Sequence, residues 1–309
     1  MGNETGIGAS ILRKEDLRFV TGKGQYVADV QLPNMTVAVL VRSPHAHARL
    51  VSIDTTAAAA LPGVVAIYTG ADLAADGVGT LPCAWPVTGK AGMASREPAH
   101  PPLAQGKVRH VGDPVALVVA ESLVEARNAA EAVVVEYDVL PAVVSVLAAL
   151  EPGATAVFDD IPDNVCVDWE VGDSAATDLA FTKAAHIARI SLVNNRLVGN
   201  PMEPRAAVGD YDRSRGKYTL WTTSQFPHIV KLLMGNVVLH IPQHKLRVVS
   251  PDVGGGFGVK QFHYAEEALV TWASGKIARP VKWVCERSEG FISDAHGRDH
   301  ASTAQLALD

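Results

Sequence analysis

The chain has 309 residues, 48% of them hydrophobic, and carries a formal net charge of −6. It is long enough to bury substantial cores, and two domains of ordinary size are expected. Its 33 acidic and 27 basic residues are spread without blocks, which argues against nucleic acid as a partner. The sequence contains neither a basic start followed by an apolar run nor a stretch of 18 apolar residues, so we expect a cytoplasmic protein without a membrane span.

The cysteine content also points to a reducing compartment. Cys83, Cys166 and Cys285 lie far apart and form neither a disulfide framework nor a C-x-x-C metal pair. We interpret each of them as a small, buried hydrophobic residue.

Strands and helices alternate at the start of the chain. Runs rich in β-branched residues predict strands over 35–42 and 63–70, and the segment DTTAAAAL between them predicts a short helix capped by Asp54. The segment 77–106 is rich in Gly, Pro and Ala and has no sustained period. It therefore predicts a long surface excursion or contact arm.

The alternation resumes after this excursion. A strand is predicted over 114–120, and Ser122 with Glu125 forms a capping-box pattern at the start of the next helix. A further strand is predicted over 133–137. These elements indicate an α/β arrangement, and we expect the first domain to close near Ser145.

Proline, glycine and acidic residues punctuate 147–165, which we interpret as a linker. Beyond it the patterns predict a strand at 184–193, a hairpin turning over 212–216, a helix at 227–239, a strand at 245–253, an amphipathic helix at 264–275 with Gly275 as its C-cap, and strands at 279–287 and 300–309. Because no terminal helix follows, we expect a truncated chain or one half of a divided subunit.

The segment SPDVGGGFGVKQFHY, residues 250–264, places glycines between a predicted strand and a predicted helix. Such a loop gathers backbone N–H groups that bind an anion, and glycine allows close approach of the ligand. The Gly-Lys-Ser/Thr sequence of a P-loop is missing, because Val259 separates Gly258 from Lys260. The spacing G-x-G-x-x-G also fails, since neither Val259 nor Gln261 is glycine.

Several motifs in the same order resemble one protein family. They are LRFVTGKGQYVADVQLP at 17–33, RSPHAHARL at 42–50, NPMEPRAAV at 200–208, TTSQFPH at 222–228, GGGFGVK at 254–260 and RPVKWVCERSE at 279–289. Together they span nearly the whole chain and resemble the large, molybdenum-bearing subunit of the xanthine oxidase family of molybdenum hydroxylases. The similarity is strongest to the bacterial branch with aerobic carbon monoxide dehydrogenase and the N-heterocycle hydroxylases.

The resemblance implies a mixed α/β (α+β) fold in two parts. Residues 18–145 would form an α/β-hammerhead domain. Residues 155–309 would form the N-terminal part of a molybdopterin-binding domain, with the remainder expected beyond Asp309.

The resemblance also implies which residues meet the cofactor. Gly255, Gly256, Phe257 and Gly258 match the family's cofactor loop, in which the phenylalanine backbone lies near the apical oxo ligand and its ring shapes the substrate channel. Gln225 matches a glutamine within hydrogen-bond reach of that oxo group. No side chain of this chain is expected to coordinate the metal directly.

Gln261 follows the lysine at a position where xanthine-oxidising members carry a glutamate. A neutral amide cannot stabilise charge as a carboxylate does, so Gln261, expected in the substrate pocket, argues against purine oxidation. The family's catalytic glutamate is expected beyond Asp309, and no catalytic residue is assigned within the chain. Carbon monoxide, aldehydes and N-heterocycles stay open as substrates.

The function implied is hydroxylation of a carbon centre with water-derived oxygen. The implied cofactor is molybdopterin cytosine dinucleotide. The implied partners are a small subunit with two [2Fe-2S] clusters, a medium FAD subunit and the remaining part of the large subunit, in a dimer of heterotrimers. Two alternatives stay open: a non-catalytic remnant or assembly module of such a complex, and an unrelated α/β nucleotide-binding protein.

Other polar residues carry simpler interpretations. His45 and His47 would share one face of a strand, where a structural or domain-contact role is favoured over a metal pair. Glu203 and Arg205 are interpreted as a buried ion pair rather than as catalytic groups. His263 would either line the substrate funnel or lie on the surface of a helix's first turn. Three tryptophans in periodic apolar settings are expected in the core: Trp221, Trp272 and Trp283.

Overall fold

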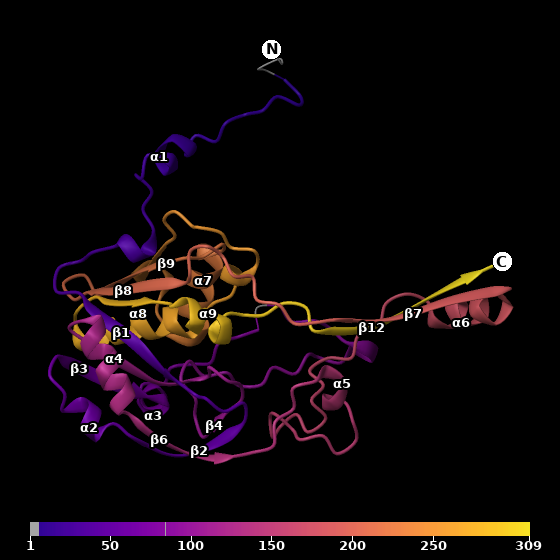
Figure 1. Cartoon of the computed structure of the whole chain (residues 1–309), viewed down its shortest axis with the longest axis horizontal. Coiled ribbons are helices and arrows are strands. Elements are labelled where there is room, and N and C mark those ends of the chain that lie inside the picture. The colour runs from indigo at the N-terminus through magenta and orange to yellow at the C-terminus, as the bar shows by residue number, and fades with distance from the viewer. Residues whose placement is uncertain (1–5, 84) are drawn as a thin grey trace.

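A seven-stranded mixed sheet forms the centre of the computed structural model, which describes residues 6–83 and 85–309. In spatial order its strands are β10 (Leu246–Val249), β9 (Lys217–Thr222), β8 (Ala206–Asp212), β11 (Val281–Val284), β1 (Thr36–Arg42), β5 (Pro114–Ala120) and β3 (Val64–Thr69). Strand β1 pairs in parallel with β11, with Thr36 opposite Val281. Segments from both sides of the predicted linker therefore share one sheet (Figure 1).

The sheet is covered by helices on both faces. All seven residues of β5 are buried, as its continuous apolar sequence requires for a strand covered on both sides. Val118 packs in a cluster with Ala129 of helix α4 (Leu123–Ala132), whereas its neighbour Leu117 packs in the cluster of Leu269 from helix α8 (Ala265–Ile277). The alternation of side chains along the strand thus joins two cores through one sheet.

The other helices are short, and none among residues 6–83 and 85–309 is both long and apolar enough to cross a lipid bilayer. They are α1 (Asp16–Val20), α2 (Thr56–Ala59), α3 (Gly70–Ala75), α5 (Val146–Ala149), α6 (Ser174–Lys183), α7 (Pro227–Leu233) and α9 (Arg287–Ser293). A π-helical turn, Met234–Val238, continues α7, so the helix predicted to Leu239 changes its hydrogen-bond pattern after Leu233.

Two smaller sheets complete the fold. Strands β4 (Lys107–Val108), β2 (Ala48–Asp54) and β6 (Val134–Val139) form one, and β7 (His186–Asn194) pairs with β12 (His300–Leu308) in the other. The β7–β12 ribbon projects away from the main body together with α6 (Figure 1). Both of its strands are exposed almost throughout.

The predicted mixed α/β fold is confirmed, with some local corrections. Gly275 is not a C-cap, because α8 continues to Ile277 and ends at Ala278 in a left-handed conformation. Gly275 instead lies against the Tyr218 ring, where a Cβ would come within 2.5 Å of the hydroxyl oxygen. His45 and His47 do not share a strand, since β2 begins only at Ala48.

The cysteine prediction was correct only for Cys285, which is buried against the main core. Cys83 and Cys166 are exposed, because both lie in irregular segments outside the packed layers. All three are free thiols. The core placement of the tryptophans is confirmed for Trp272 and Trp283, and Trp221 packs at the edge of a smaller cluster.

Candidate cofactor site

The glycine segment, residues 250–264, connects the carboxyl end of β10 to α8. Gly255, Phe257 and Gly258 have left-handed backbones, with φ of 97°, 52° and 85°. Glycine tolerates this conformation, but for phenylalanine it is strained, and such strain concentrates at functional sites. The Phe257 ring lies over Gly255, where a Cβ would be 2.9 Å from Cε2, and the side chain is 76% exposed.

Three backbone N–H groups of the glycine segment are available to a ligand. Gly255, Gly256 and Phe257 are consecutive, and their N–H groups donate to no acceptor within residues 6–83 and 85–309. Successive free N–H groups in a loop with left-handed residues form a concavity that binds anionic or oxygen-bearing groups. The segment therefore offers a preformed site for such a group.

Gln225, between β9 and α7, is held against this loop. Its Oε1 accepts a hydrogen bond from the Gly258 N–H at 3.1 Å, and its backbone N–H donates to the Lys260 carbonyl at 2.7 Å. A Cβ at Gly256 would overlap the Gln225 side chain. Because the Gly258 N–H requires an oxygen, the amide orientation is fixed, and Nε2 is left as a donor with no acceptor among the described residues.

Glu203 and Lys260 fasten the segment from inside. Lys260 is buried, and its Nζ donates to Glu203 Oε2 at 2.8 Å, the same oxygen that accepts the Gly254 N–H at 2.7 Å. Burial lowers the pKa of Lys260, while the Glu203 carboxylate opposes that shift. The predicted Glu203–Arg205 ion pair is therefore wrong, because Glu203 turns toward the glycine segment. Glu203 Oε1 is buried without a hydrogen-bond partner among the described residues.

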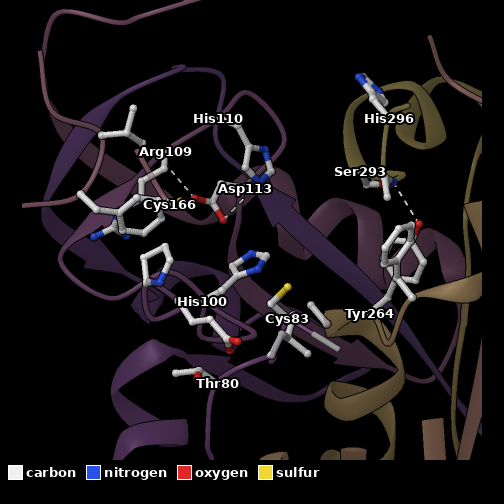
Figure 2. Close-up of a pocket in the computed structure, with 18 of the residues that line it drawn as sticks. Thr80, Cys83, His100, Arg109, His110, Asp113, Cys166, Tyr264, Ser293 and His296 are labelled. Carbon is white, nitrogen blue, oxygen red and sulfur yellow. Dashed lines mark hydrogen bonds and ion pairs between the residues drawn. The ribbon is translucent and has the colours of Figure 1, made fainter. Parts of the chain in front are cut away.

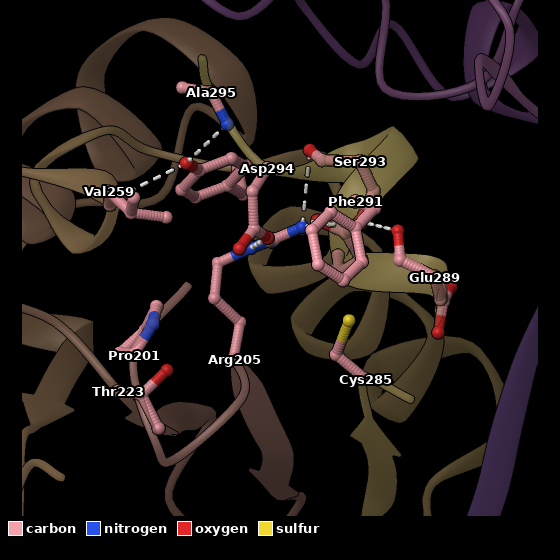
Figure 3. A network of polar contacts seen from close by, with 12 residues as sticks. Pro201, Arg205, Thr223, Val259, Cys285, Glu289, Phe291, Ser293, Asp294 and Ala295 are labelled. Carbon is pink, nitrogen blue, oxygen red and sulfur yellow. Dashed lines mark hydrogen bonds and ion pairs between the residues drawn. The ribbon is translucent and has the colours of Figure 1, made fainter. Parts of the chain in front are cut away.

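Arg205 instead forms the centre of a separate buried network (Figure 3). Its guanidinium donates to Glu266 Oε2 at 2.7 Å and to Asp294 Oδ1 at 2.6 Å, and it lies 3.6 Å from the centroid of the Tyr264 ring. Arg42 adds a second cation, 2.6 Å from Glu266 Oε1. Tyr264 in turn donates its hydroxyl to the Val259 carbonyl at 2.6 Å. The network thus connects α8 and α9 to the end of the glycine segment.

This network makes stability depend on pH. Burial alone would raise the pKa of Glu266, but the charges of Arg205 and Arg42 outweigh burial and lower that pKa to about 2. A carboxylate with a lowered folded pKa stabilises the fold above its unfolded pKa and loses that effect as the pH falls. We expect wild type to lose about 3 kcal/mol between about pH 5 and pH 2 relative to the Glu266→Gln variant. Urea titrations of both proteins across this range test the expectation, and parallel curves would contradict it.

Residues of two other motifs quoted above form hydrogen bonds with the glycine segment or with the residues beside it. Arg287 donates to the side chain of Asn200 at 2.5 Å and to the carbonyls of Pro201 and Met202. Arg18, near the N-terminus, pairs with Asp252, whose second contact is the Gln25 N–H at 2.8 Å. Residues far apart in the sequence therefore converge on the loop.

A cavity of about 1620 Å³ lies beside the segment (Figure 2). Gln261 and His263 line it, whereas Phe257, Gln225 and 255–258 do not. The structure thus brings the predicted cofactor residues together and places Gln261 on a neighbouring wall. The surface interpretation of His263 is wrong, because its side chain is buried and its Nδ1 lies 2.7 Å from Glu267 Oε2.

The sequence patterns predicted neither the Glu203–Lys260 pair nor the buried network around Arg205. They predicted an amphipathic α8, whereas all residues from Ala265 to Ser274 are buried, including Glu266 and Glu267. Two adjacent carboxylates within an apolar helix were the available signal, since a buried carboxylate requires a partner. The predicted structural role of His47 agrees with its contact to the Pro141 carbonyl, 2.8 Å from Nδ1.

Two family descriptions match the chain. Residues 21–141 match the aldehyde oxidase and xanthine dehydrogenase a/b hammerhead domain, and residues 157–309 match the molybdopterin cofactor-binding domain. These matches overturn the alternative of an unrelated nucleotide-binding protein.

Known proteins of this family are similar in sequence to almost the whole chain. The carbon monoxide dehydrogenase large chain of Afipia carboxidovorans is 38% identical over 98% of this chain and 37% of its own length. The nicotine 6-hydroxylase large subunit of Paenarthrobacter nicotinovorans is 36% identical over 97% of this chain and 36% of its own length. The crystal structure of quinoline 2-oxidoreductase from Pseudomonas putida 86 superposes with a TM-score of 0.89 at 38% identity, covering 98% of this chain and 37% of that one.

The chain thus spans little more than a third of these relatives. Within that span the hammerhead match, the molybdopterin-binding match and the superposition all identify the same family. The chain therefore belongs to the family of molybdopterin-binding large subunits of the molybdenum hydroxylases.

Proposed function

We propose that this chain forms the cofactor-holding part of a molybdenum hydroxylase that oxidises a carbon centre of an aldehyde, an N-heterocycle or carbon monoxide. The observation that carries the proposal is the run of three consecutive N–H groups, those of Gly255, Gly256 and Phe257, which have no acceptor among the described residues and lie beside the amide of Gln225. The division into a hammerhead domain at 18–145 and a cofactor domain at 155–309 belongs to the same proposal.

The residues present fit an oxygen-rich cofactor. A Cβ at Gly255 or Gly256 would fill the space next to the Phe257 ring or the Gln225 side chain. Around Gly258 no atom of the other described residues, its two chain neighbours aside, lies within 4 Å of a Cβ position, so the loop is open on that side. Molybdopterin cytosine dinucleotide would be held here by backbone donors rather than by side-chain metal ligands. When bound, it supplies the two-electron oxidation of carbon with oxygen taken from water.

Each group of the chain has a definite task in this proposal. The Gly255–Phe257 N–H groups donate to oxygen atoms of the cofactor, and Gln225 Nε2 adds a side-chain donor. The Glu203–Lys260 pair keeps the loop rigid, which preorganises those donors before the cofactor arrives. The exposed Phe257 ring would flank the approach of substrate to the loop. Gln261 would line the neighbouring cavity, where its neutral amide disfavours purines.

Further polypeptide is needed to complete the enzyme in this proposal. The β7–β12 ribbon exposes apolar side chains, including Val193, Ile190 and Leu306, and such a surface is typical of an interface. We propose that the remaining part of a large subunit covers it and supplies the catalytic residues. Electrons would pass to a [2Fe-2S] subunit and an FAD subunit in a cytoplasmic dimer of heterotrimers. The free cysteines Cys83, Cys166 and Cys285 form no cluster site among the described residues, so the iron–sulfur centres would belong to a partner.

The proposal is tested on the complex that co-purifies with this chain. We expect about one molybdenum atom and one released CMP per chain after acid treatment, because the dinucleotide carries one of each. If both are missing while partner subunits still co-purify, the chain is an assembly module or remnant instead, and the proposal fails.

A further inference from the structure

Three potential metal ligands meet in the wall of the cavity. His100 comes from the irregular segment between α3 and β4, while His110 and Asp113 lie on the turn between β4 and β5. One ligand atom from each lies within 4.8 Å of the others, and all three residues line the cavity. Figure 2 shows the three side chains gathered at one place.

The surroundings orient two of these ligands. His110 Nδ1 lies 3.0 Å from the Val111 carbonyl, which can only accept a hydrogen bond, so Nδ1 carries the proton and Nε2 presents its lone pair. Asp113 is buried, and its Oδ2 accepts the backbone N–H of Arg109 at 2.9 Å, which leaves Oδ1 without a hydrogen-bond donor among the described residues. The His110 Nε2 and Asp113 Oδ1 atoms are 3.8 Å apart, too far for a hydrogen bond.

That spacing suits a bridging ion. Ligand atoms about 2.0–2.2 Å from a tetrahedral zinc ion lie roughly 3.4 Å from one another. Because the ligand atoms lie within 4.8 Å of one another, the group needs to contract by at most about 1.4 Å. The His100 side chain makes no hydrogen bond to the described residues that would resist this movement. The nearby Arg109 guanidinium is held 4.5 Å from the centroid of the Phe158 ring, so it is engaged elsewhere.

We propose that His100, His110 and Asp113 bind one divalent transition-metal ion of the zinc class, with an open coordination position toward the cavity. Two imidazoles and one carboxylate form a ligand set that favours such ions over calcium or magnesium. The ion would tie the irregular segment 77–106 to the turn before β5. The expectation that no side chain coordinates the molybdenum directly is unaffected, and this site is independent of the molybdenum proposal.

The test uses the full chain freed of metal with a chelator. Calorimetric titration with Zn²⁺ should give one site per chain, and Co²⁺ should produce visible d–d absorption. His100→Ala and His110→Ala should each weaken binding about tenfold or more, because loss of a residue that only supports a ligand already costs that much. The control is His296→Ala, because His296 lines the same cavity but its Nε2 already contacts the Phe291 carbonyl at 2.9 Å.

Unchanged Zn²⁺ affinity in His100→Ala, or an equal loss in His296→Ala, overturns the proposal. Thermal unfolding without metal shows whether each variant is folded. Should His110→Ala not fold, His100→Gln decides the question, since no hydrogen bond of the described residues depends on the His100 side chain. Retained Zn²⁺ binding in that variant would also refute the site.

Discussion

Replacing Arg205 with methionine should lower the free energy of unfolding by about 3–5 kcal/mol. The side chain is 4% exposed and is the partner of both Glu266 and Asp294. Among the described residues, methionine leaves Asp294 without a charged partner and leaves Glu266 with Arg42 alone. Removing one member of a buried charge network is costly because the remaining charges stay out of water. Urea denaturation, with circular dichroism as the signal, measures the change.

Two further variants distinguish the effect of the Arg205 charge from that of its forked hydrogen bonding, and a buried ion pair from an exposed one. Arg205→Lys retains the charge but loses the fork that bonds two carboxylates at once, so we expect an intermediate loss. Arg215→Ala is the surface control, since its side chain is 77% exposed and its pair with Asp212 spans 3.7 Å, and the change should stay within about 0.5 kcal/mol. Equal losses for Arg205→Met and Arg215→Ala would mean that the buried network contributes nothing particular to stability.

Local sequence patterns correctly predicted the features that depend on a few neighbouring residues. The Ser122 hydroxyl accepts the Glu125 N–H at 3.3 Å, as the cap pattern predicted. The hairpin turn over 212–216 is stabilised by Asp212 Oδ1, which accepts the Ser214 N–H at 2.9 Å. The buried run over 114–120 forms β5 at the predicted bounds. In each case a few neighbouring residues carry the whole signal.

Long-range pairing was beyond those patterns. Nothing near Thr36 indicates that it will lie opposite Val281 in a parallel pair. The wrong C-cap at Gly275 has a similar cause, because the Tyr218 ring occupies the space of a side chain and requires glycine inside the helix. Tertiary packing decided both features, and propensity is only a weak prior against it.

The candidate site also has features that the sequence predicted and features that it did not. The family motifs identified the Gly255–Gly258 loop and Gln225, which the structure brings together. The partner of Glu203 could not be chosen from the sequence, because Arg205 and Lys260 are both cations and only the folded chain decides which one reaches it. The cavity was also hidden, since its walls come from segments spread over the chain.

Substituting Gly256 by alanine should reduce the molybdenum content of the co-purified complex at least about tenfold. A Cβ at this position would overlap Gln225 Cδ, Oε1 and Cγ. Gln225 would have to move, and with it the acceptor of the Gly258 N–H. The free energy of unfolding should fall by only about 1–3 kcal/mol, as for other overpacked sites. Metal analysis and urea denaturation measure the two effects separately.

Gly297→Ala is the matched control, because no described residue beyond its two chain neighbours lies within 4 Å of its Cβ position, and neither Gly256 nor Gly297 has a left-handed backbone. It should retain wild-type molybdenum. The double variant Gly256→Ala/Gln225→Ala removes the overlapping side chain and should recover the stability lost in Gly256→Ala, since the two residues are in contact. Its molybdenum content should stay low, because the Nε2 donor is gone. Full molybdenum in Gly256→Ala would show that the loop and Gln225 do not hold the cofactor.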